Sequence, residues 1–271
     1  MTVHLESPAE TEEMDFLDLK DISIAYDGKV AVRGIDLRIG EGEFVSIIGP
    51  SGCGKSTLLH VLAGLKQPET GRITYRSADV TAEVGKRLRT GYVFQDHRLL
   101  PWRTVRRNIE IAMHSGGVPK SEWAGRITKY LALLQVSDHI DAWPMNLSGG
   151  QRQRVSIARA LAVEPDLVLM DEPFSGLDEV TGRTIRIELD RMRSASATPT
   201  LFVTHSIREA LYLSDRILVL SRGPATVLEE VVVPLPRPRQ YGDPVLVRME
   251  EELVNDVLKV WEPAAAEGEG S

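Results

Sequence analysis

The chain has 271 residues, a formal net charge of −7, 42% hydrophobic residues and a single cysteine. Chains of this length bury about three quarters of their unfolded surface, which excludes disorder throughout, and one cysteine excludes an intrachain disulfide framework. The acidic start lacks the basic and apolar segments of a signal peptide, so we expect a reducing compartment and no export. The acidic balance also argues against a protein that coats nucleic acid.

The N-terminal part of the chain combines a polar tail with alternating segments. Residues 1–15 are acidic and aperiodic, which predicts a disordered tail. Residues 16–24 and 31–39 are rich in β-forming residues, and the turn pair Asp27-Gly28 lies between them. This pattern predicts antiparallel strands near the start of the chain.

The middle and C-terminal parts alternate helical patterns with short apolar runs. Residues 104–162 are mostly helical in pattern and predict an inserted helical subdomain. Continuous apolar runs then alternate with helical patterns, as in a parallel sheet covered by helices on both faces. These runs are residues 167–170, 200–204 and 217–220. The sequence therefore predicts an α/β fold with a parallel sheet, an N-terminal antiparallel β-subdomain and a helical subdomain.

The C-terminal end is predicted to be a helical extension followed by a tail. Within the extension, residues 237–262, the stretch 245–261 has the pattern of one amphipathic helix. This helix either packs back on the core or extends a contact between two copies, and the pattern does not choose between them. Residues 263–271 are small and polar, which predicts a disordered tail. No apolar run approaches the roughly 20 residues of a membrane-spanning helix.

Residues 49–56 carry the first chemical motif. They fit the pattern G-x-x-x-x-G-K-[ST] between a buried strand predicted at 43–49 and a helix predicted from Lys55 onward. Glycines let backbone N–H groups face phosphate oxygens, Lys55 reaches the β- and γ-phosphates, and Ser56 binds Mg²⁺. The predicted phosphate-binding residues are Gly49, Pro50, Ser51, Gly52, Cys53, Gly54, Lys55, Ser56 and Thr57. An ordinary glycine turn before a helix is the alternative.

Two carboxylates follow the apolar run at 167–170. Asp171 and Glu172 stand where a strand of the predicted sheet ends, which is the edge where α/β sheets bind ligands. Asp171 is expected to hold Mg²⁺, and Glu172 to orient and deprotonate an attacking water. The phosphate loop upstream turns this common pattern into a specific prediction of an NTPase site.

The run Leu147-Ser148-Gly149-Gly150-Gln151-Arg152 resembles the signature motif of ABC-type ATPases. Other family motifs occur in the expected order: Tyr26 before the phosphate loop, Gln95 of the Q-loop, the Asp171-Glu172 pair, Asp178 of the D-loop and His205 of the switch. The resemblance covers residues 16–236 and implies one complete nucleotide-binding domain.

The resemblance implies a role for each matching residue. Tyr26 would stack on adenine, Gln95 would contact Mg²⁺ and the attacking water, and His205 would bond to the γ-phosphate. In the family two domains pair head to tail, so each signature completes the other copy's ATP site. Ser148, Gly149, Gly150 and Gln151 would thus bind nucleotide held by a second copy, and Asp178 would organise the contact between the copies.

Each of these residues also has a plainer interpretation. Gln95 is a surface residue, His205 a structural histidine, Asp178 a helix cap and Tyr26 a core aromatic under that interpretation. Cys53 stands at a free position of its motif, and we interpret it as a small filler rather than a redox residue.

The resemblance also indicates a kind of transporter. The run Gln95-Asp96-His97-Arg98-Leu99-Leu100-Pro101-Trp102 resembles the importer branch that serves nitrate, taurine and aliphatic sulfonates. The partners implied are transmembrane permease subunits and, indirectly, a solute-binding protein, with the chain peripheral on the cytoplasmic side of the inner membrane. An exposed Leu99-to-Trp102 run suits a permease helix, whereas burial within the helical subdomain is the alternative.

Two other functions are compatible with a phosphate loop in a chain of this kind. A P-loop kinase for a small molecule would need no role for Ser148, and a soluble ABC-type ATPase of DNA or the ribosome would bind nucleic acid. Glu172 and His205 argue against a scaffold that does not hydrolyse ATP, and no nucleic-acid partner is expected.

Overall fold

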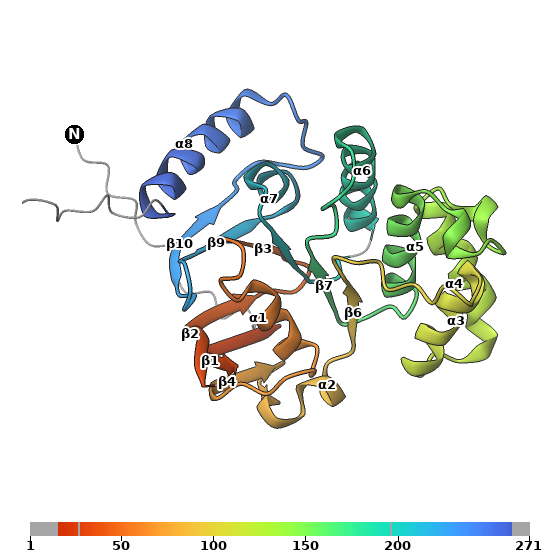
Figure 1. Ribbon diagram of the computed structural model, residues 1–271, viewed down its shortest axis with the longest axis horizontal. Helices are drawn as coiled ribbons and strands as arrows, with labels where there is room; N and C mark the ends of the chain where they lie inside the picture. Colours follow the sequence, from red (N-terminus) through yellow and green to blue (C-terminus); the bar gives the residue numbers. More distant parts are fainter. Residues whose placement is uncertain (1–15, 27, 196, 262–271) are drawn as a thin grey trace, which may run out of the picture.

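The computed structural model describes residues 16–26, 28–195 and 197–261 (Figure 1). The predicted tails at 1–15 and 263–271, and Asp27 of the predicted turn, lie outside the described residues. Among those described, no helix combines the length and the apolar character needed to cross a membrane.

Two sheets form the body of the molecule. The first is antiparallel with strand order β2-β1-β4-β5, and the second has the order β10-β9-β3-β8-β7-β6. The first sheet comprises β1 (Leu17–Tyr26), β2 (Lys29–Ile39), β4 (Thr70–Tyr75) and β5 (Ala78–Asp79). The second comprises β3 (Phe44–Ile48), β6 (Thr90–Val93), β7 (Leu167–Asp171), β8 (Thr200–Thr204), β9 (Arg216–Leu220) and β10 (Val227–Val232). Five strands of the second sheet run parallel, and β10 pairs antiparallel to β9.

The predicted α/β fold class is therefore confirmed. Strand β3 is buried along its whole length, as expected for a parallel strand covered on both faces. Its Val45 and Ile47 join a core shared with the antiparallel sheet, whereas Phe44 and Ile48 pack on the opposite side. Because the parallel strands end at one edge, the segments that follow β3, β7 and β8 come together there.

Four longer helices cover the six-stranded sheet. They are α1 (Lys55–Leu62), α6 (Glu179–Ala195), α7 (Ile207–Leu213) and α8 (Pro244–Trp261), and a short turn of helix comprises η1 (Thr81–Glu83) and α2 (Val84–Arg87). Figure 1 shows α1 below the sheet, facing the antiparallel strands, and α6, α7 and α8 above it. Leu246, Leu253 and Val257 of α8 are buried in one cluster with Leu211 of α7. The C-terminal helix thus packs back on the core.

A group of helices lies beside the six-stranded sheet, at the right of Figure 1, and its last helix packs against β6. It comprises α3 (Val105–Ser115), α4 (Lys120–Leu133), η2 (Ser137–His139), η3 (Pro144–Asn146) and α5 (Gly149–Leu161). Helix α4 ends before the apolar pattern does, because Gln135 takes a left-handed conformation with φ of 52°. The domain limits predicted from the sequence, at 104–162, 16–236 and 237–262, stay predictions.

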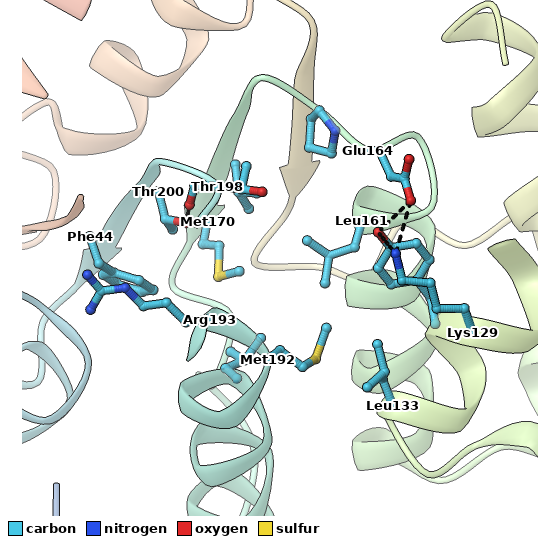
Figure 2. Close-up of a pocket in the computed structure, with 14 residues that line it drawn as sticks. Phe44, Lys129, Leu133, Leu161, Glu164, Met170, Met192, Arg193, Thr198 and Thr200 are labelled. Atoms are coloured by element: carbon cyan, nitrogen blue, oxygen red, sulfur yellow. Dashed lines mark hydrogen bonds and ion pairs between the residues drawn. The ribbon is translucent and has the colours of Figure 1, made fainter. Parts of the chain in front are cut away.

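A pocket of about 330 Å³ lies at the seam between these helices and the sheet. Figure 2 shows Lys129 and Leu133 of α4 and Leu161 of α5 on one side, with Met170 of β7 and Met192 of α6 on the other. None of the predicted site residues lines this pocket. The predicted residues Asp171, Glu172 and His205 lie instead at the ends of β7 and β8.

Candidate functional site

The loop between β3 and α1 has a backbone that only glycine fits. Gly54 has φ of 117°, and a Cβ there would lie 2.8 Å from Cγ2 of Val32 and 2.9 Å from the carbonyl oxygen of Ala31. Gly52 also has a positive φ, 75°. Positive φ values of this kind are typical of loops whose backbone N–H groups face a bound phosphate. The loop conformation is thus compatible with the predicted motif.

Lys55 is the first residue of α1 and lies within this loop. Its side chain is 5% exposed, and Nζ donates hydrogen bonds to the carbonyl oxygens of Gly49 at 2.8 Å and Pro50 at 3.0 Å. Ser51 and Gly52 are exposed at the tip of the loop, and Thr57 is half-buried in the first turn of α1. The Lys55 ammonium is therefore buried within the loop, at the position where the motif predicts a phosphate-binding lysine.

Ser56 and Asp171 meet next to this loop. The hydroxyl of Ser56 donates to Oδ1 of Asp171 at 2.8 Å, and the Tyr92 hydroxyl approaches Oδ2 at 3.4 Å. Burial raises the pKa of Asp171 above its ordinary value, and the nearby Glu172 carboxylate raises it further. Hydroxyl and carboxylate oxygens are the ligands that Mg²⁺ prefers. Ser56 and Asp171 therefore fit a magnesium ion held against the phosphates.

The Glu172 carboxylate lies between the phosphate loop and the end of β8. Its Oε2 lies 3.0 Å from Nδ1 of His205, and its Oε1 lies 3.9 Å from Nζ of Lys55. The backbone of Glu172 has φ of 43°, and its N–H donates to the carbonyl of Val203 at 2.8 Å. The structure thus brings together Lys55, Ser56, Asp171, Glu172 and His205, which the sequence places up to 150 positions apart.

Gln95 and Tyr26 occupy two exposed positions. Gln95 lies just after β6 and is exposed, while its neighbour Phe94 stacks on Tyr92 at 4.1 Å between ring centroids. Tyr26 is 44% exposed at the end of β1, which excludes the core interpretation of this ring. The Lys66 ammonium covers one of its faces, 4.3 Å from the ring centroid.

The signature residues stand at the start of α5. Ser148 is the N-cap, its hydroxyl accepting from the Gln151 N–H at 3.2 Å, and Oε1 of Gln151 accepts from the Ser148 N–H at 2.8 Å. This reciprocal pair is a capping box. Figure 1 shows α5 apart from α1, so the signature lies away from the same chain's phosphate loop.

Asp178 acts as a helix cap in the structure. Its Oδ1 accepts from the Thr181 N–H at 2.9 Å in the first turn of α6. Hydrogen bonds from Thr181 hold the pKa of Asp178 below its ordinary value. Thr181 in turn lies against the signature, because a Cβ on Gly150 would come within 2.5 Å of its Cγ2. A role of Asp178 between two copies stays a prediction.

Cys53 is 2% exposed and packs under the loop. A Cβ on Gly49 would lie 2.9 Å from its Sγ, so the thiol fills the space that Gly49 leaves. Burial raises the pKa of the thiol, which disfavours the reactive thiolate. These contacts favour the interpretation of Cys53 as a filler.

The run after Gln95 is partly buried and partly exposed. Leu99 packs against the cluster of the helical group, whereas Trp102 is 65% exposed. Burial within the helical group is therefore seen for Leu99, and exposure for Trp102, while contact with a permease stays a prediction.

Sequence reasoning missed a polar network that supports His205. Glu209 of α7 accepts from the Thr204 hydroxyl at 2.6 Å and pairs with the buried Arg186 at 2.7 Å. Arg186 also donates to the Tyr241 hydroxyl at 2.6 Å. The network thus links Thr204, the residue before His205, to α7 through Glu209 and to α6 through Arg186. Its only sequence signal is an acid in the first turn after β8.

Comparisons with known proteins find a matching family model and several similar proteins. Residues 32–175 match the family model described as ABC transporter. The chain is 37% identical over 258 residues to an aliphatic sulfonates import ATP-binding protein of Agrobacterium fabrum, covering 94% of this chain and 87% of the relative. It is 41% identical over 233 residues to a nitrate import ATP-binding protein of Synechococcus elongatus, covering 83% of this chain and 35% of the relative.

A solved structure is similar over most of the chain. It is the dimeric post-hydrolysis state of an ATP-binding cassette bound to ADP and Pi, with a TM-score of 0.71 and 32% identity. The match covers 81% of this chain and 100% of the cassette.

Proposed function

The chain belongs to the ABC transporter family, and on that premise we propose that it is the ATP-hydrolysing subunit of a bacterial importer. As an ABC-type ATPase it binds ATP with Mg²⁺ and hydrolyses the nucleotide. The proposed importer takes up a small anionic solute of the sulfonate, taurine or nitrate type through separate membrane subunits. The chain would lie on the cytoplasmic side of the inner membrane as a peripheral subunit.

One observation carries the importer proposal. The similarity to the aliphatic sulfonates import protein extends over 94% of the chain, well beyond the motifs common to NTPases. The similarity to a nitrate import protein points to the same class of solute, a small anion. The solute itself would be selected by a binding protein and a permease.

The chain's own residues supply the parts of an ATPase. Bound Mg²⁺ neutralises charge that develops on the phosphates. We assign Lys55 and the loop N–H groups to hold the phosphates, and Ser56 and Asp171 to hold the metal, on the contacts described above. Glu172 is assigned to orient the attacking water and take its proton, with His205 fixing its carboxylate. Gln95 is assigned to the metal and the water, and Tyr26 to adenine.

Two copies are needed for a complete site in this proposal. The signature residues lie on α5, apart from the same chain's loop (Figure 1), and they present a helix N-terminus that attracts phosphate. A head-to-tail pair would place the Ser148 of each copy opposite the Lys55 of the other. ATP would hold the copies together and hydrolysis would release them.

A groove beside Gln95 is the proposed contact with the permease. It has a volume of about 350 Å³ and lies between β6, α2, α3 and the end of α5. Three arginines line it, Arg89, Arg98 and Arg159, and the exposed Trp102 lies on the segment that follows Arg98. Arg159 ties this segment to α5 by donating to the carbonyls of His97 at 2.8 Å and Arg98 at 2.6 Å. A cytoplasmic helix of the permease with acidic and apolar residues would fit this groove.

Steady-state ATPase activity at increasing protein concentration tests the composite site. An ATPase shared by two copies loses specific activity on dilution, with an order above one in protein. Activity strictly proportional to protein concentration would reject the paired site and favour a single-chain phosphotransferase.

Uptake in proteoliposomes tests the transport proposal. The chain is reconstituted with a permease that co-purifies with it and a matching binding protein, and uptake of labelled taurine, an alkanesulfonate and nitrate is measured. ATP-dependent uptake of one of these anions is expected. Trp102→Ala should reduce co-purification with the permease and leave basal ATPase unchanged, whereas Trp143→Ala, a second exposed tryptophan, should change neither. Failure of all three anions to enter would reject the solute class.

A further inference from the structure

The amide group of Gln151 makes contacts on both of its sides. Its Oε1 accepts from the Ser148 N–H at 2.8 Å and so completes the capping box. Its Nε2 lies 2.7 Å from Nε2 of His139, a residue nine positions before Ser148 in the short helix η2. No motif singles out His139, and the contact appears only in the folded chain.

The direction of this hydrogen bond follows from the amide. Because the oxygen of Gln151 already receives the Ser148 N–H, the group facing His139 is the NH₂, which can only donate. Nε2 of His139 must therefore be the acceptor, and the ring proton belongs on Nδ1. The histidine thus fixes which way the Gln151 amide points.

Hydrogen bonds hold the backbone of the segment that carries His139. The His139 carbonyl accepts from the Ala142 N–H at 2.9 Å, closing a tight turn. The first turn of α3 then binds this segment, since the Arg106 N–H donates to the carbonyl of Ile140 at 2.8 Å and the Val105 N–H to that of Ala142 at 2.9 Å. The turn and α3 therefore fix the backbone of this segment, and the imidazole contacts Gln151 at the start of α5.

We infer that His139 is a positioning residue for the signature motif. By accepting from Nε2 it keeps Oε1 of Gln151 on the Ser148 N–H, and the capping box then holds the Ser148 hydroxyl and the first N–H groups of α5 in one geometry. The inference rests on the proposed function, because the second copy's nucleotide is what this helix start would meet. Without an acceptor at position 139 the amide rotates freely, and the Ser148 N–H loses its partner.

Two substitutions separate positioning from simple space filling. The Oε1 of a glutamine reaches as far from Cβ as Nε2 of histidine does, whereas the Oδ1 of an asparagine falls one bond short. His139→Gln therefore keeps the acceptor, and His139→Asn keeps a polar amide of smaller reach. His114→Asn is the matched control, since His114 is an exposed histidine of α3.

The first measurement is amide hydrogen exchange of residues 148–151 in the purified chain without nucleotide. Loss of one hydrogen bond is expected to speed exchange at Ser148 by roughly two- to tenfold in His139→Asn. His139→Gln and His114→Asn should match the wild-type chain. Equal exchange in the asparagine and glutamine variants would overturn the inference.

The second measurement is the protein concentration that gives half-maximal specific ATPase activity. It should rise by roughly two- to tenfold in His139→Asn, with the ATP affinity of the dilute chain unchanged and with rescue by His139→Gln. An unchanged midpoint in His139→Asn would also overturn the inference. A wild-type chain that shows no concentration dependence would instead reject the proposed function, while the exchange experiment would still judge the contact between His139 and Gln151.

Discussion

Oε2 of Glu172 lies 3.0 Å from Nδ1 of His205, across the ends of two adjacent parallel strands. The backbone of Glu172 is fixed from both directions, since its N–H donates to Val203 and its carbonyl accepts from the Ser175 hydroxyl at 2.9 Å. The carboxylate therefore stands between the histidine and Lys55 without depending on loop flexibility. A general base needs a fixed position within hydrogen-bond reach of the water whose proton it takes.

Replacing Glu172 with Gln should abolish turnover and leave ATP binding intact. The glutamine keeps the shape and the contact with His205 but cannot take a proton, so kcat should fall by about 10²- to 10⁴-fold. Phosphate release measures kcat, and gel filtration with ATP should show a longer-lived dimer.

The matched control for this variant is Glu83→Gln, an acid of η1 whose side chain is 49% exposed. It should hydrolyse ATP like the wild-type chain. Steady-state hydrolysis by Glu172→Gln at the wild-type rate would remove Glu172 from the catalytic assignment.

Gly54→Ala should abolish ATP binding and lower stability. The backbone has φ of 117°, and the new Cβ would lie 2.8 Å from Val32 and 2.9 Å from the Ala31 carbonyl, so the loop has to move. The free energy of unfolding should fall by roughly 1–3 kcal/mol, measured by urea denaturation, with ATP binding measured by calorimetry. Gly117→Ala is the control, because Gly117 has φ of 71° but nothing within 4 Å of its Cβ position. It should cost less stability and leave ATP binding unchanged, and equal ATP affinity in both variants would contradict the steric argument.

Asp171→Asn should stabilise the chain measured without nucleotide while removing Mg²⁺-dependent activity. Burial raises the pKa of Asp171 in the folded chain above its ordinary value of 3.8. The folded chain thus holds this proton more tightly than the unfolded chain, so stability is lost as the pH rises from 3.8 through the raised pKa. At neutral pH the folded chain bears the full free-energy cost of burying the charged Asp171 carboxylate, and Asp171→Asn removes this cost.

Thermal unfolding at several pH values tests whether Asp171→Asn is more stable than the wild-type chain, as predicted. At pH 7 Asp171→Asn should melt a few degrees higher than the wild-type chain, and the difference should shrink toward pH 4. With ATP and Mg²⁺ present the order should reverse, because only the wild-type carboxylate binds the metal. A lower melting temperature of Asp171→Asn at pH 7 without nucleotide would show that its contacts with Ser56 and Tyr92 outweigh the burial cost.

Local sequence was sufficient for the buried elements and the motifs. The continuous apolar runs at 167–170 and 200–204 became β7 and β8, because only strands covered on both faces carry such runs. Strands with few buried residues escaped prediction. In β10 no residue is buried, and in β4 only Ile73 is, so neither strand carries a strong hydrophobic pattern.

Contacts between distant residues were out of reach of the sequence. The sequence could place Glu209 in a helix after His205, but not its pairing with Arg186, which depends on how α6 packs on α7. The plainer interpretation of Asp178, a helix cap, could be derived locally and is seen. The same limit hid His139, whose ring meets Gln151 only after η2 folds onto α3.

Arg239→Met should destabilise the chain through the packing of its C-terminal extension. The arginine is 6% exposed and donates to the carbonyls of Leu211, Ser214, Val233 and Leu235. Burial lowers its pKa to about 10, so it stays charged at neutral pH. Methionine fills the volume but leaves these carbonyls without donors, and the free energy of unfolding should fall by roughly 2–4 kcal/mol.

Urea denaturation followed by tryptophan fluorescence measures this loss, since Trp261 at the end of α8 donates to the Leu220 carbonyl at 2.9 Å and reports on the helix. Arg239→Lys should lose less, because an ammonium offers three donors at one point but cannot reach carbonyls spread around a planar guanidinium. Arg222→Met, at an exposed arginine, should unfold like the wild-type chain. If Arg239→Met unfolds at the wild-type urea concentration, the carbonyls find water instead, and α8 is held by its apolar face alone.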